Sequence, residues 1–501
     1  MLRVIQIFCA TLWCLCSAGI IFGFAAFKVV LIEEGVYSEY CSASQNNSFQ
    51  EPCIEQDLRL NFMFAVSAGI TNVMAFPVGY ILDNYGPRVC GIIGSLFLTL
   101  ASSMFIWASS LPLFFDPYLA GYILLAIGGP FVFISSFQLA NSFPTKSGSI
   151  LALLTGAFDS SSALFVLYRI CYQKGSLNLS LHNFFSLYLL VPTFILLCQL
   201  TIMPHSSYKT RANMAKLSIE GLNENGELAR ENDATSISEE NETQALLPQE
   251  TGDEFIQHSS SENHLHRRKS VLEVYIEGQL EEKSGGVFGI LHNLEAKDQI
   301  KSPWFYLMLV FSVISMLRIN YFIATIRSQE EYLLGNIDLA LEMNHIFDIL
   351  LPLGGVISIP FIGMILDKMK TFNVLVLMSV TSVIISLLGL IPNSFSLNLM
   401  GILLLVVYRP FYYTVVSDYS SKIFGFDTFG TVYGLLICIC GFCNFGQNWL
   451  DKCTHIVFNM NPIPVNLLLL FASILSACIL LKYIHVQLMR KQGPQQFCEN
   501  Y

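Results

Sequence analysis

Long apolar runs recur along the whole chain and are separated by short polar turns. The first set lies at about 4–30, 60–82, 89–110, 117–140, 149–172 and 181–203, and the second at about 303–325, 341–366, 373–392, 396–417, 428–450 and 463–486. A helix needs about 20 apolar residues to cross the hydrocarbon core of a bilayer. The pattern therefore predicts an all-α membrane protein with 12 transmembrane helices in two six-helix bundles.

A polar segment separates the two sets of runs. The stretch from Leu222 to Ser261 is rich in Glu, Asn, Ser and Thr, a composition typical of disordered segments, and Ser270 to Leu280 is expected to form a short surface helix. The predicted parts are an N-terminal bundle at 1–203, a disordered acidic cytosolic loop at 204–302, a C-terminal bundle at 303–487 and a cytosolic tail at 488–501.

Composition supports an integral membrane protein and excludes other classes. Hydrophobic residues make up 53% of the 501-residue chain and charged residues only 13%, about half the charge that soluble domains carry. The net charge of −10 comes mostly from the central loop, so it indicates no nucleic-acid partner. The sequence contains no phosphate-binding Gly-x-x-x-x-Gly-Lys-Ser/Thr loop, metal-ligand cluster or nucleophile elbow. We therefore expect neither an enzyme nor a cofactor or metal, and the expected partners are a small-molecule substrate and the lipid bilayer.

Loop charges predict the orientation, because cytosolic loops carry an excess of Lys and Arg. Counted along the loops, this bias places both chain ends in the cytosol. The sequons at Asn46 and Asn178 then lie on the opposite side and are predicted glycosylation sites. Cys41 and Cys53 share the polar loop of Asn46, so a disulfide between them is a candidate, with two free thiols as the alternative.

A short motif repeats at the same position of each half. Gly79 to Asp83 (GYILD) ends the second apolar run, and Gly363 to Asp367 (GMILD) ends the eighth. The first copy continues to Gly86 and Arg88, and resembles the loop between the second and third helices of the major facilitator transporters. Two parallel six-helix repeats are also typical of that superfamily.

The motif predicts a gate on the cytosolic side. The carboxylate of Asp83 is expected to bind the positive N-terminus of the eleventh helix, near Asp427 to Gly430, when that side is closed. The alternative is that Asp83 only caps its own loop. The second copy, which ends at Asp367, lacks the later Gly and Arg, so its gating role rests on the shorter motif. The predicted gating residues are Gly79, Asp83, Gly86, Arg88 and Asp367.

The fifth apolar run carries a more specific resemblance. The segment from Gly156 to Phe165 (GAFDSSSALF) resembles solute carrier family 43, nearest to its nucleobase-transporter branch. Gly128-Gly129 and Arg409 also match, so the resemblance spans both halves, and the whole layout is similar to a fungal branch of that family. The resemblance implies sodium-independent transport of large neutral amino acids or of purine nucleobases.

Ionisable side chains inside the apolar runs are the main candidates for a site, since each costs several kcal/mol in a membrane unless it is paired or faces water. In one interpretation, Arg409 or Arg318 receives an anionic or carbonyl group, and Asp159 with the following serines receives an amine or ring nitrogen. In the other, Asp348 and Arg409 form a structural ion pair. The predicted substrate-binding residues are Asp159, Ser160, Ser161, Arg318, Arg409, Gln138 and Asn141.

These observations predict a transporter that moves a small polar solute by alternating access, either facilitative or proton-linked. A neutral amino acid is the expected solute, with a purine nucleobase as the alternative and a non-transporting receptor or scaffold as the alternative of another class. In the central loop, Glu242 with Leu246 and Leu247 forms a dileucine-type signal for sorting adaptors. This signal favours a vacuolar or lysosomal membrane over the plasma membrane.

Overall fold

The computed structural model describes residues 2–41, 54–110, 116–143, 146–173, 179–204, 271–292 and 294–498. Within these ranges, 11 helices are long and apolar enough to cross a membrane. The segments Leu2–Ala18 and Ile20–Glu33, bent by 45° at Gly19, add the twelfth span when they are counted as one. The predicted fold class is confirmed.

Residues 2–204 form the N-terminal bundle. Its elements are α1 (Leu2–Trp13), η1 (Cys14–Ala18), η2 (Ile20–Gly23), α2 (Phe24–Glu33), η3 (Ser38–Tyr40), α3 (Ile54–Tyr85), α4 (Pro87–Ile106), η4 (Ala108–Ser110), α5 (Pro117–Ser136), η5 (Phe137–Ser142), α6 (Ser147–Ser160), α7 (Ala163–Gln173), α8 (Leu181–Tyr188) and α9 (Leu190–Thr201). The first span is made of four short helical elements, and the fourth, fifth and sixth spans are made of two each, where the sequence predicted continuous runs.

The C-terminal bundle has longer, mostly continuous helices. Its elements are α14 (Pro303–Leu334), α15 (Ile337–Lys368), α16 (Thr371–Leu388), α17 (Phe395–Phe424), α18 (Phe429–Asn444), α19 (Gly446–Lys452), η7 (Cys453–Val457) and α20 (Ile463–Cys498), preceded by α12 (Val271–Ser284) and α13 (Ala296–Ile300). The last helix therefore includes most of the segment that the sequence assigned to a cytosolic tail.

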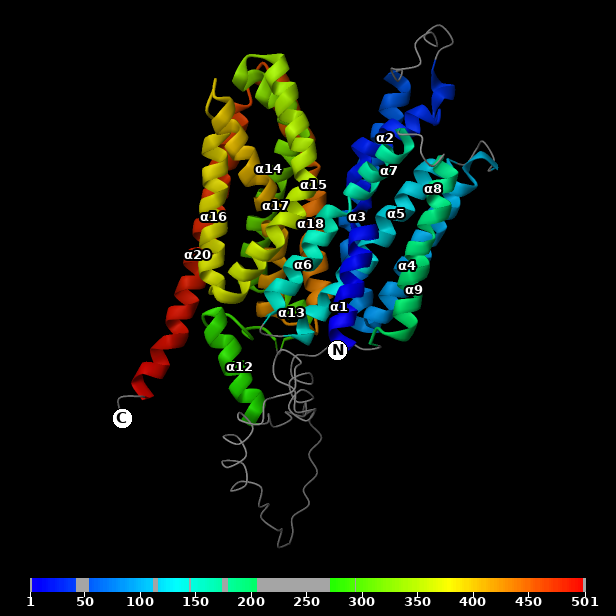
Figure 1. Ribbon diagram of the computed structural model, residues 1–501. Helices are drawn as coiled ribbons and strands as arrows, with labels where there is room; N and C mark the ends of the chain where they lie inside the picture. Colours follow the sequence, from blue (N-terminus) through cyan, green and yellow to red (C-terminus); the bar gives the residue numbers. More distant parts are fainter. Residues whose placement is uncertain are drawn as a thin grey trace.

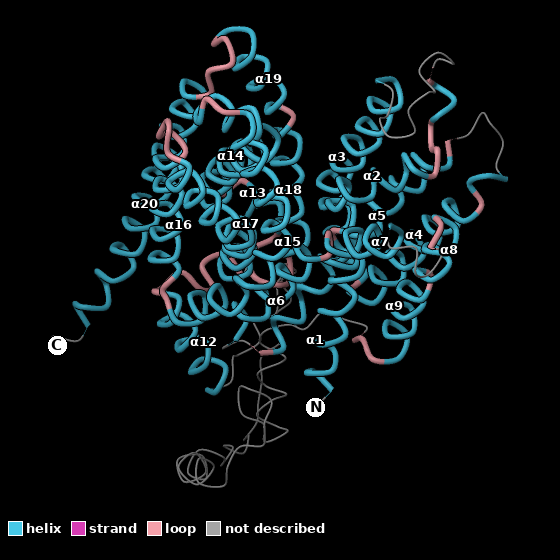
Figure 2. The backbone as a smooth tube through the Cα atoms, turned by 45° about the horizontal axis from the view of Figure 1, so that its top comes forward, coloured by secondary structure: helices cyan, strands magenta, loops and turns pink. Residues whose placement is uncertain are grey.

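The two bundles stand side by side, and both chain ends lie at the same end of the molecule together with α12 (Figure 1). We call this end the inner face and the opposite end the outer face. In the second view, α19 lies at the outer face of the C-terminal bundle and α12 again lies at the inner face (Figure 2). A chain that crosses the membrane an even number of times has both ends on the same side, as observed here.

Two pairs of helices, one member from each bundle, hold the bundles together: α3 packs along α18, and α6 packs along α15. Both contacts are made at glycines. A Cβ atom added to Gly79 would lie 1.8 Å from the carbonyl oxygen of Gly430, and one added to Gly355 would lie 3.1 Å from that of Gly156. The backbones therefore approach as closely as in small-residue helix contacts of membrane proteins.

The breaks in the first and fifth spans fit against each other. Ser161 Oγ donates to the carbonyl of Phe158, 2.6 Å away, and accepts from the backbone N–H of Gly19 at 2.9 Å. A serine hydroxyl that bonds its own backbone competes with the helix ladder, which explains why α6 ends just before Ser161. The kink in the first span is thereby tied to the kink beside Asp159.

The segment after α12 supports the turn between α17 and α18. The backbone N–H groups of Gly289 and Leu291 donate to the carbonyls of Lys422 and Ile423, at 3.0 and 3.1 Å. Gln299 is fully buried; its Nε2 donates to the carbonyls of Leu291 and Phe424, each at 2.9 Å. Gln299 also accepts from the hydroxyl of Thr428 at 2.6 Å. Part of the segment assigned to the central loop is thus folded onto the start of α18.

We expect Gln299→Ala to destabilise the C-terminal bundle, because it leaves buried carbonyls without donors, at a cost of about 1–3 kcal/mol. The measurement is the Tm of the purified protein in detergent. Glu295→Ala is the matched control, since Glu295 is exposed and its side chain makes no capping hydrogen bond. Equal Tm values for the two variants would contradict this role of Gln299.

Candidate functional site

A cavity of about 450 Å³ lies between the two bundles, at the level where helices of both halves face each other. Its walls are formed by α3, α5 and α6 on one side and by α14, α17 and α18 on the other. This volume is in the range of sites that bind small organic molecules. The midplane interface between the repeats is also where transporters of this architecture bind their substrates.

The wall of the cavity is mainly apolar and contains several aromatic rings and carboxamides. Its aromatic residues are Phe22, Phe64, Phe133, Phe158, Tyr413, Tyr433 and Phe445. Its carboxamides are Asn72, Asn320, Asn444, Gln447 and Asn448. The side chains of Asn320 and Asn444 are hydrogen-bonded at 3.1 Å. Aromatic faces accept apolar or planar groups, and the amides add oriented donors and acceptors.

The cavity opens toward the outer face. Its lining residues nearest that face, including Ala65, Ala324 and Asn448, are exposed. The lining residues nearest the inner face, including Ala75 and Thr155, are buried, with exposed fractions of 2% and 1%. The structure therefore has an outward-open site with a closed inner side.

An ion pair that joins the two bundles lies at the wall of the cavity. Arg409 Nη2 in α17 is 3.5 Å from Asp159 Oδ1 in α6. The Arg409 side chain lines the cavity and is 11% exposed, whereas the Asp159 side chain lies behind it and is 1% exposed. Neither carboxylate oxygen of Asp159, nor Nε of Arg409, has a hydrogen-bond partner within the described part of the chain.

This lack of hydrogen bonds distinguishes the pair from an ordinary structural salt bridge. Buried polar atoms are nearly always hydrogen-bonded, and a charge buried without such partners is costly. Water or a ligand in the adjoining cavity can complete the coordination of the Arg409 guanidinium. A planar guanidinium at this position is suited to a carboxylate or carbonyl oxygen.

The serines after Asp159 have separate positions. Ser162 lines the cavity, and its hydroxyl donates to the carbonyl of Asp159 at 3.0 Å. Ser160 Oγ donates across the bundle interface to the carbonyl of Pro352, a long contact of 3.4 Å. Ser161 is engaged in the kink described above. Ser160 and Ser161 thus make contacts between helices, and Ser162 lines the cavity.

The remaining predicted binding residues lie away from the central cavity. Arg318 lines a small cavity inside the C-terminal bundle. Gln138 lines a narrow pocket beside Trp13 and Gln199. Asn141 lies at the inner face. The side chain of Asp348, in α15, lies outside the described ones, so its pairing with Arg409 stays a prediction.

At the inner face, Asp83 binds the start of α18. Its two carboxylate oxygens accept hydrogen bonds from the backbone N–H groups of Gly430, at 2.9 Å, and Thr431, at 2.6 Å. These N–H groups belong to the first turn of a helix, where they have no partner within the helix and the dipole favours negative charge. The contact crosses from the N-terminal to the C-terminal bundle.

The second copy of the motif makes the equivalent contact in the opposite direction. Asp367, at the end of α15, accepts from the backbone N–H of Ser149 at 3.2 Å and from its hydroxyl. Ser149 lies in the first turn of α6 in the N-terminal bundle. The shorter motif is therefore sufficient for this contact.

The later residues of the first copy act within the N-terminal bundle. Gly86 makes the one-residue turn between α3 and α4 with φ of +85°, a conformation that favours glycine. Arg88 donates to the carbonyl of Met203, just after α9, through Nε at 3.1 Å and Nη2 at 2.6 Å. These residues shape the loop that carries Asp83.

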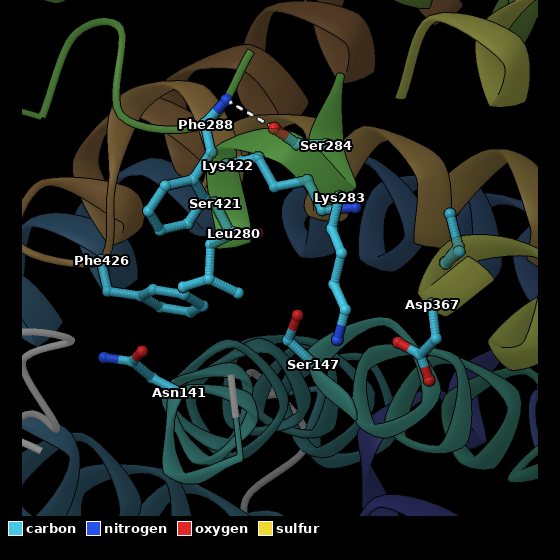
Figure 3. A pocket seen from close by; sticks show the side chains of 11 residues that line it. Asn141, Ser147, Leu280, Lys283, Ser284, Phe288, Asp367, Ser421, Lys422 and Phe426 are labelled. Atoms are coloured by element: carbon cyan, nitrogen blue, oxygen red, sulfur yellow. Dashed lines mark hydrogen bonds between the residues drawn. The ribbon is translucent and has the colours of Figure 1, made fainter. Parts of the chain in front are cut away.

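A small pocket beside Asp367 shows how α12 covers this interface (Figure 3). Lys283 extends from α12 toward Ser147, at the start of α6, while Lys422 and Phe426 belong to the C-terminal bundle. The helix from the central segment therefore lines a pocket together with residues of both bundles at the inner face.

Several predicted sites lie outside the described residues. They are the sequons at Asn46 and Asn178, the cysteine Cys53, and the sorting signal Glu242, Leu246 and Leu247. Cys41 is described and is disulfide-bonded. Its pairing with Cys53 stays a prediction.

Most of the aromatic and amide wall of the cavity was not predicted from the sequence; of its rings, only Tyr413, close to Arg409, is a candidate there for stacking on a planar solute. Rings within apolar runs look the same whether they pack in a core or line a site, so no local signal separates Phe158 from Phe165, which is fully buried. Asn72, Asn320 and Asn444 carry a weak signal, because each is an amide inside an apolar run. Uncharged polar residues in spanning helices also bridge helices, so this signal is ambiguous.

Known proteins are similar to this chain over almost its whole length or over about a third of it. The chain is 61% identical over 492 residues to Protein FMP42 of Saccharomyces cerevisiae, covering 98% of this chain and 96% of that protein. It is 30% identical over 177 residues to Equilibrative nucleobase transporter 1 of Bos taurus, covering 34% and 36%. It is 26% identical over 179 residues to the human Large neutral amino acids transporter small subunit 3, covering 32% of each. No family model matches the chain.

Solved structures show the same fold at low sequence identity. The proton:xylose symporter XylE aligns with a TM-score of 0.59 and 15% identity, covering 96% of each chain. FucP, a major facilitator transporter in the outward conformation, aligns with a TM-score of 0.55 and 10% identity, covering 96% of this chain and 99% of that one. The predicted resemblance to major facilitator transporters is confirmed.

We expect Asp83→Ala to loosen the inner interface. Each hydrogen bond to a charged group contributes about 1.5–3 kcal/mol, so its loss shifts the balance between closed and open inner sides by about tenfold or more. Spin labels at Tyr85 and Lys368, exposed at the inner ends of α3 and α15, report the separation of the bundles. Exposed Cys443 and Cys478 are first replaced by serine to avoid labelling.

The double electron–electron resonance distribution of Asp83→Ala should gain a longer-distance population. Asn84→Ala is the matched control, because Asn84 is exposed and bonds only within its own helix, to the carbonyl of Tyr80 at 2.8 Å. A distribution for Asp83→Ala that matches the control would show that the carboxylate contact does not hold the inner side closed.

Proposed function

Because this chain belongs to one family with the yeast Protein FMP42 and has the fold of major facilitator transporters, we propose that it carries a neutral amino acid across a membrane by alternating access. Arg409 binds the carboxylate of the solute. Asp159 holds the guanidinium and balances its charge. The aromatic wall receives the side chain of the solute.

The charge of the site supports a neutral solute. A lone arginine at the wall of the cavity would favour anions, but Asp159 lies 3.5 Å from Arg409 and makes the pair neutral. A zwitterionic amino acid has the same balance, with a carboxylate for the guanidinium and an ammonium group that the nearby carboxylate attracts. The apolar and aromatic remainder of the cavity then suits a large uncharged side chain.

The two inner contacts support alternating access. Asp83 with α18 and Asp367 with α6 both cross the bundle interface, and both can form only while the inner ends are together. The present structure, in which the cavity opens outward, contains both of these contacts. Their release, with closure of the outer end around a bound solute, would present Arg409 to the inner face.

A purine nucleobase is the second candidate. Planar rings stack on aromatic faces, and the amides of Asn72, Asn320 and Asn444 can bond the edges of a heterocycle. The bovine relative is named a nucleobase transporter. The ion pair favours the amino acid, because an uncharged ring needs neither a guanidinium nor a carboxylate. The ion pair, buried without further hydrogen bonds among the described residues, favours a transporter over a scaffold.

The location of the protein rests on its sequence alone. A dileucine-type signal at Glu242, Leu246 and Leu247 would direct it to a vacuolar or lysosomal membrane, with the plasma membrane as the alternative. Replacing both leucines by alanine should then move a fluorescently tagged protein away from that compartment.

We expect Asp159→Asn and Arg409→Gln to lower uptake of labelled leucine into proteoliposomes by about tenfold or more, since each removes a charge-assisted contact of about 1.5–3 kcal/mol. Glu330→Gln is the matched control. Glu330 is also a buried carboxylate of a spanning helix, bonded by Asn398 at 3.0 Å, but it lies outside the central cavity.

Labelled adenine is tested in parallel with wild-type protein. Uptake of adenine but not leucine would move the assignment to the nucleobase. Leucine uptake that is unchanged in both charge variants would remove the ion pair from the mechanism. An inward acid gradient that accelerates leucine uptake would select proton-linked over facilitative transport.

A further inference from the structure

The ion pair lies part-way along the depth of the central cavity. The two contacts at the inner face, at Ser149 of α6 and Gly430 of α18, set a common reference level. Asp159 follows Ser149 by 10 residues, a rise of about 15 Å along α6. Gly441 follows Gly430 by 11 residues, a rise of about 16 Å along α18. The ion pair is therefore level with Gly441, where α18 packs against Asn72 of α3.

The cavity continues inward beyond the ion pair. Thr155 lies one helical turn inward of Asp159 in α6. Tyr413 lies one turn inward of Arg409, because α17 runs toward the inner face. We call this part of the cavity the inner compartment, and its lining residues are Ala75, Thr155, Tyr413, Tyr433 and Ile437.

Helix α18 supplies one wall and the floor of the inner compartment. Ile437 follows Gly430 by 7 residues, a rise of about 10 Å, and is 8% exposed. Tyr433, one turn closer to the inner face, stacks on Phe429 with ring centroids 5.0 Å apart. It also meets Phe137 of the N-terminal bundle at 5.7 Å. Three packed rings thus close the compartment toward the inner face, and hydroxyl groups are the polar groups of its lining side chains.

The outer part of the cavity has a different character. All five carboxamides that line the cavity lie at the level of the ion pair or further out. Asn72 is at that level, and Asn444 lies about one turn further out, where Asn320 bonds it at 3.1 Å. Gln447 and Asn448 belong to α19 at the outer face (Figure 2). The outer part is therefore polar and open to solvent, whereas the inner compartment is apolar and enclosed.

We propose that the solute binds with its side chain pointing toward the inner face, and that Ile437 determines which side chains fit. This inference rests on the proposed binding of the solute carboxylate by Arg409. With the carboxylate held at the ion pair, the side chain can extend into the outer part or into the inner compartment. A large apolar side chain is stabilised by leaving water, and it would cover the polar groups of the carboxamides if it pointed outward.

The orientation also connects the solute to the inner gate. Ile437 and Tyr433 belong to the helix whose first turn Asp83 binds. A side chain in the inner compartment packs directly against this helix. The solute class that follows is a neutral amino acid whose side chain is large, apolar and limited in size by Ile437.

The ratio of kcat/KM for labelled phenylalanine to that for labelled leucine, measured in proteoliposomes, tests this orientation. Ile437→Ala widens the inner compartment and should raise the ratio, whereas Ile437→Phe narrows it and should lower the ratio. We expect about tenfold in each direction, the lower end of what one methylene group contributes in an apolar pocket. A general loss of stability would not move the ratio in opposite directions. If Ile437→Phe does not fold, Ile437→Val should give a smaller rise than Ile437→Ala.

Ile323→Ala and Ile323→Phe are the matched controls. Ile323 lines the same cavity, but on α14 and one turn beyond Asn320 toward the outer face. The same substitutions there should leave the ratio unchanged.

Each failure has its own signature. A ratio that changes in the Ile323 variants, or that stays constant in all variants, would overturn the proposed orientation while amino acid transport by the wild type stands. A wild type that takes up adenine but neither amino acid would overturn the proposed function and this inference with it.

Discussion

The structure depends on a carboxylate placed at the first turn of a helix in the opposite bundle. Asp83 binds the start of α18, and Asp367 binds the start of α6, so the contact is made twice with the roles of the bundles exchanged. Unpaired N–H groups and the helix dipole give a carboxylate a strong and directional partner there. Glycines beside these contacts let the helices come close enough for them to form. The result is a closed inner face and a cavity that opens outward.

The ion pair between Asp159 and Arg409 uses the same interface. It joins α6 to α17 at the wall of the cavity, so the group that lines the cavity also links the bundles. Because Arg409 lines the cavity and its partner Asp159 belongs to the opposite bundle, a change in the position of one bundle alters the site directly. Binding and bundle movement are thereby coupled through one pair of side chains.

The apolar pattern was sufficient to predict the twelve spans and their division into halves. Each helix must cross a hydrocarbon core of nearly fixed thickness and bond its own backbone groups there, so each span is an apolar run of similar length. The motif at Gly79 to Asp83 also indicated which helix its carboxylate faces, since the repeat fixes the order of the helices. The bend at Gly19 was not predictable, because it depends on Ser161 in another span. For the same reason, the partner of Arg409 and the fold of the segment around Gln299 required the structure: each contact joins residues more than a hundred positions apart.

The central claim is that the inner ends must separate during each transport cycle. A cross-link between Ser149→Cys and Gly363→Cys tests it most directly, because a Cβ atom added at position 363 would lie 3.2 Å from the Cβ of Ser149. This is slightly closer than the roughly 3.5–4.5 Å of a disulfide, so the bond forms after a small shift of the two helices. The account predicts that the oxidised double variant binds solute at the outer face but carries none across the membrane, and that a reductant restores transport. Transport at the wild-type rate with the disulfide intact would contradict it.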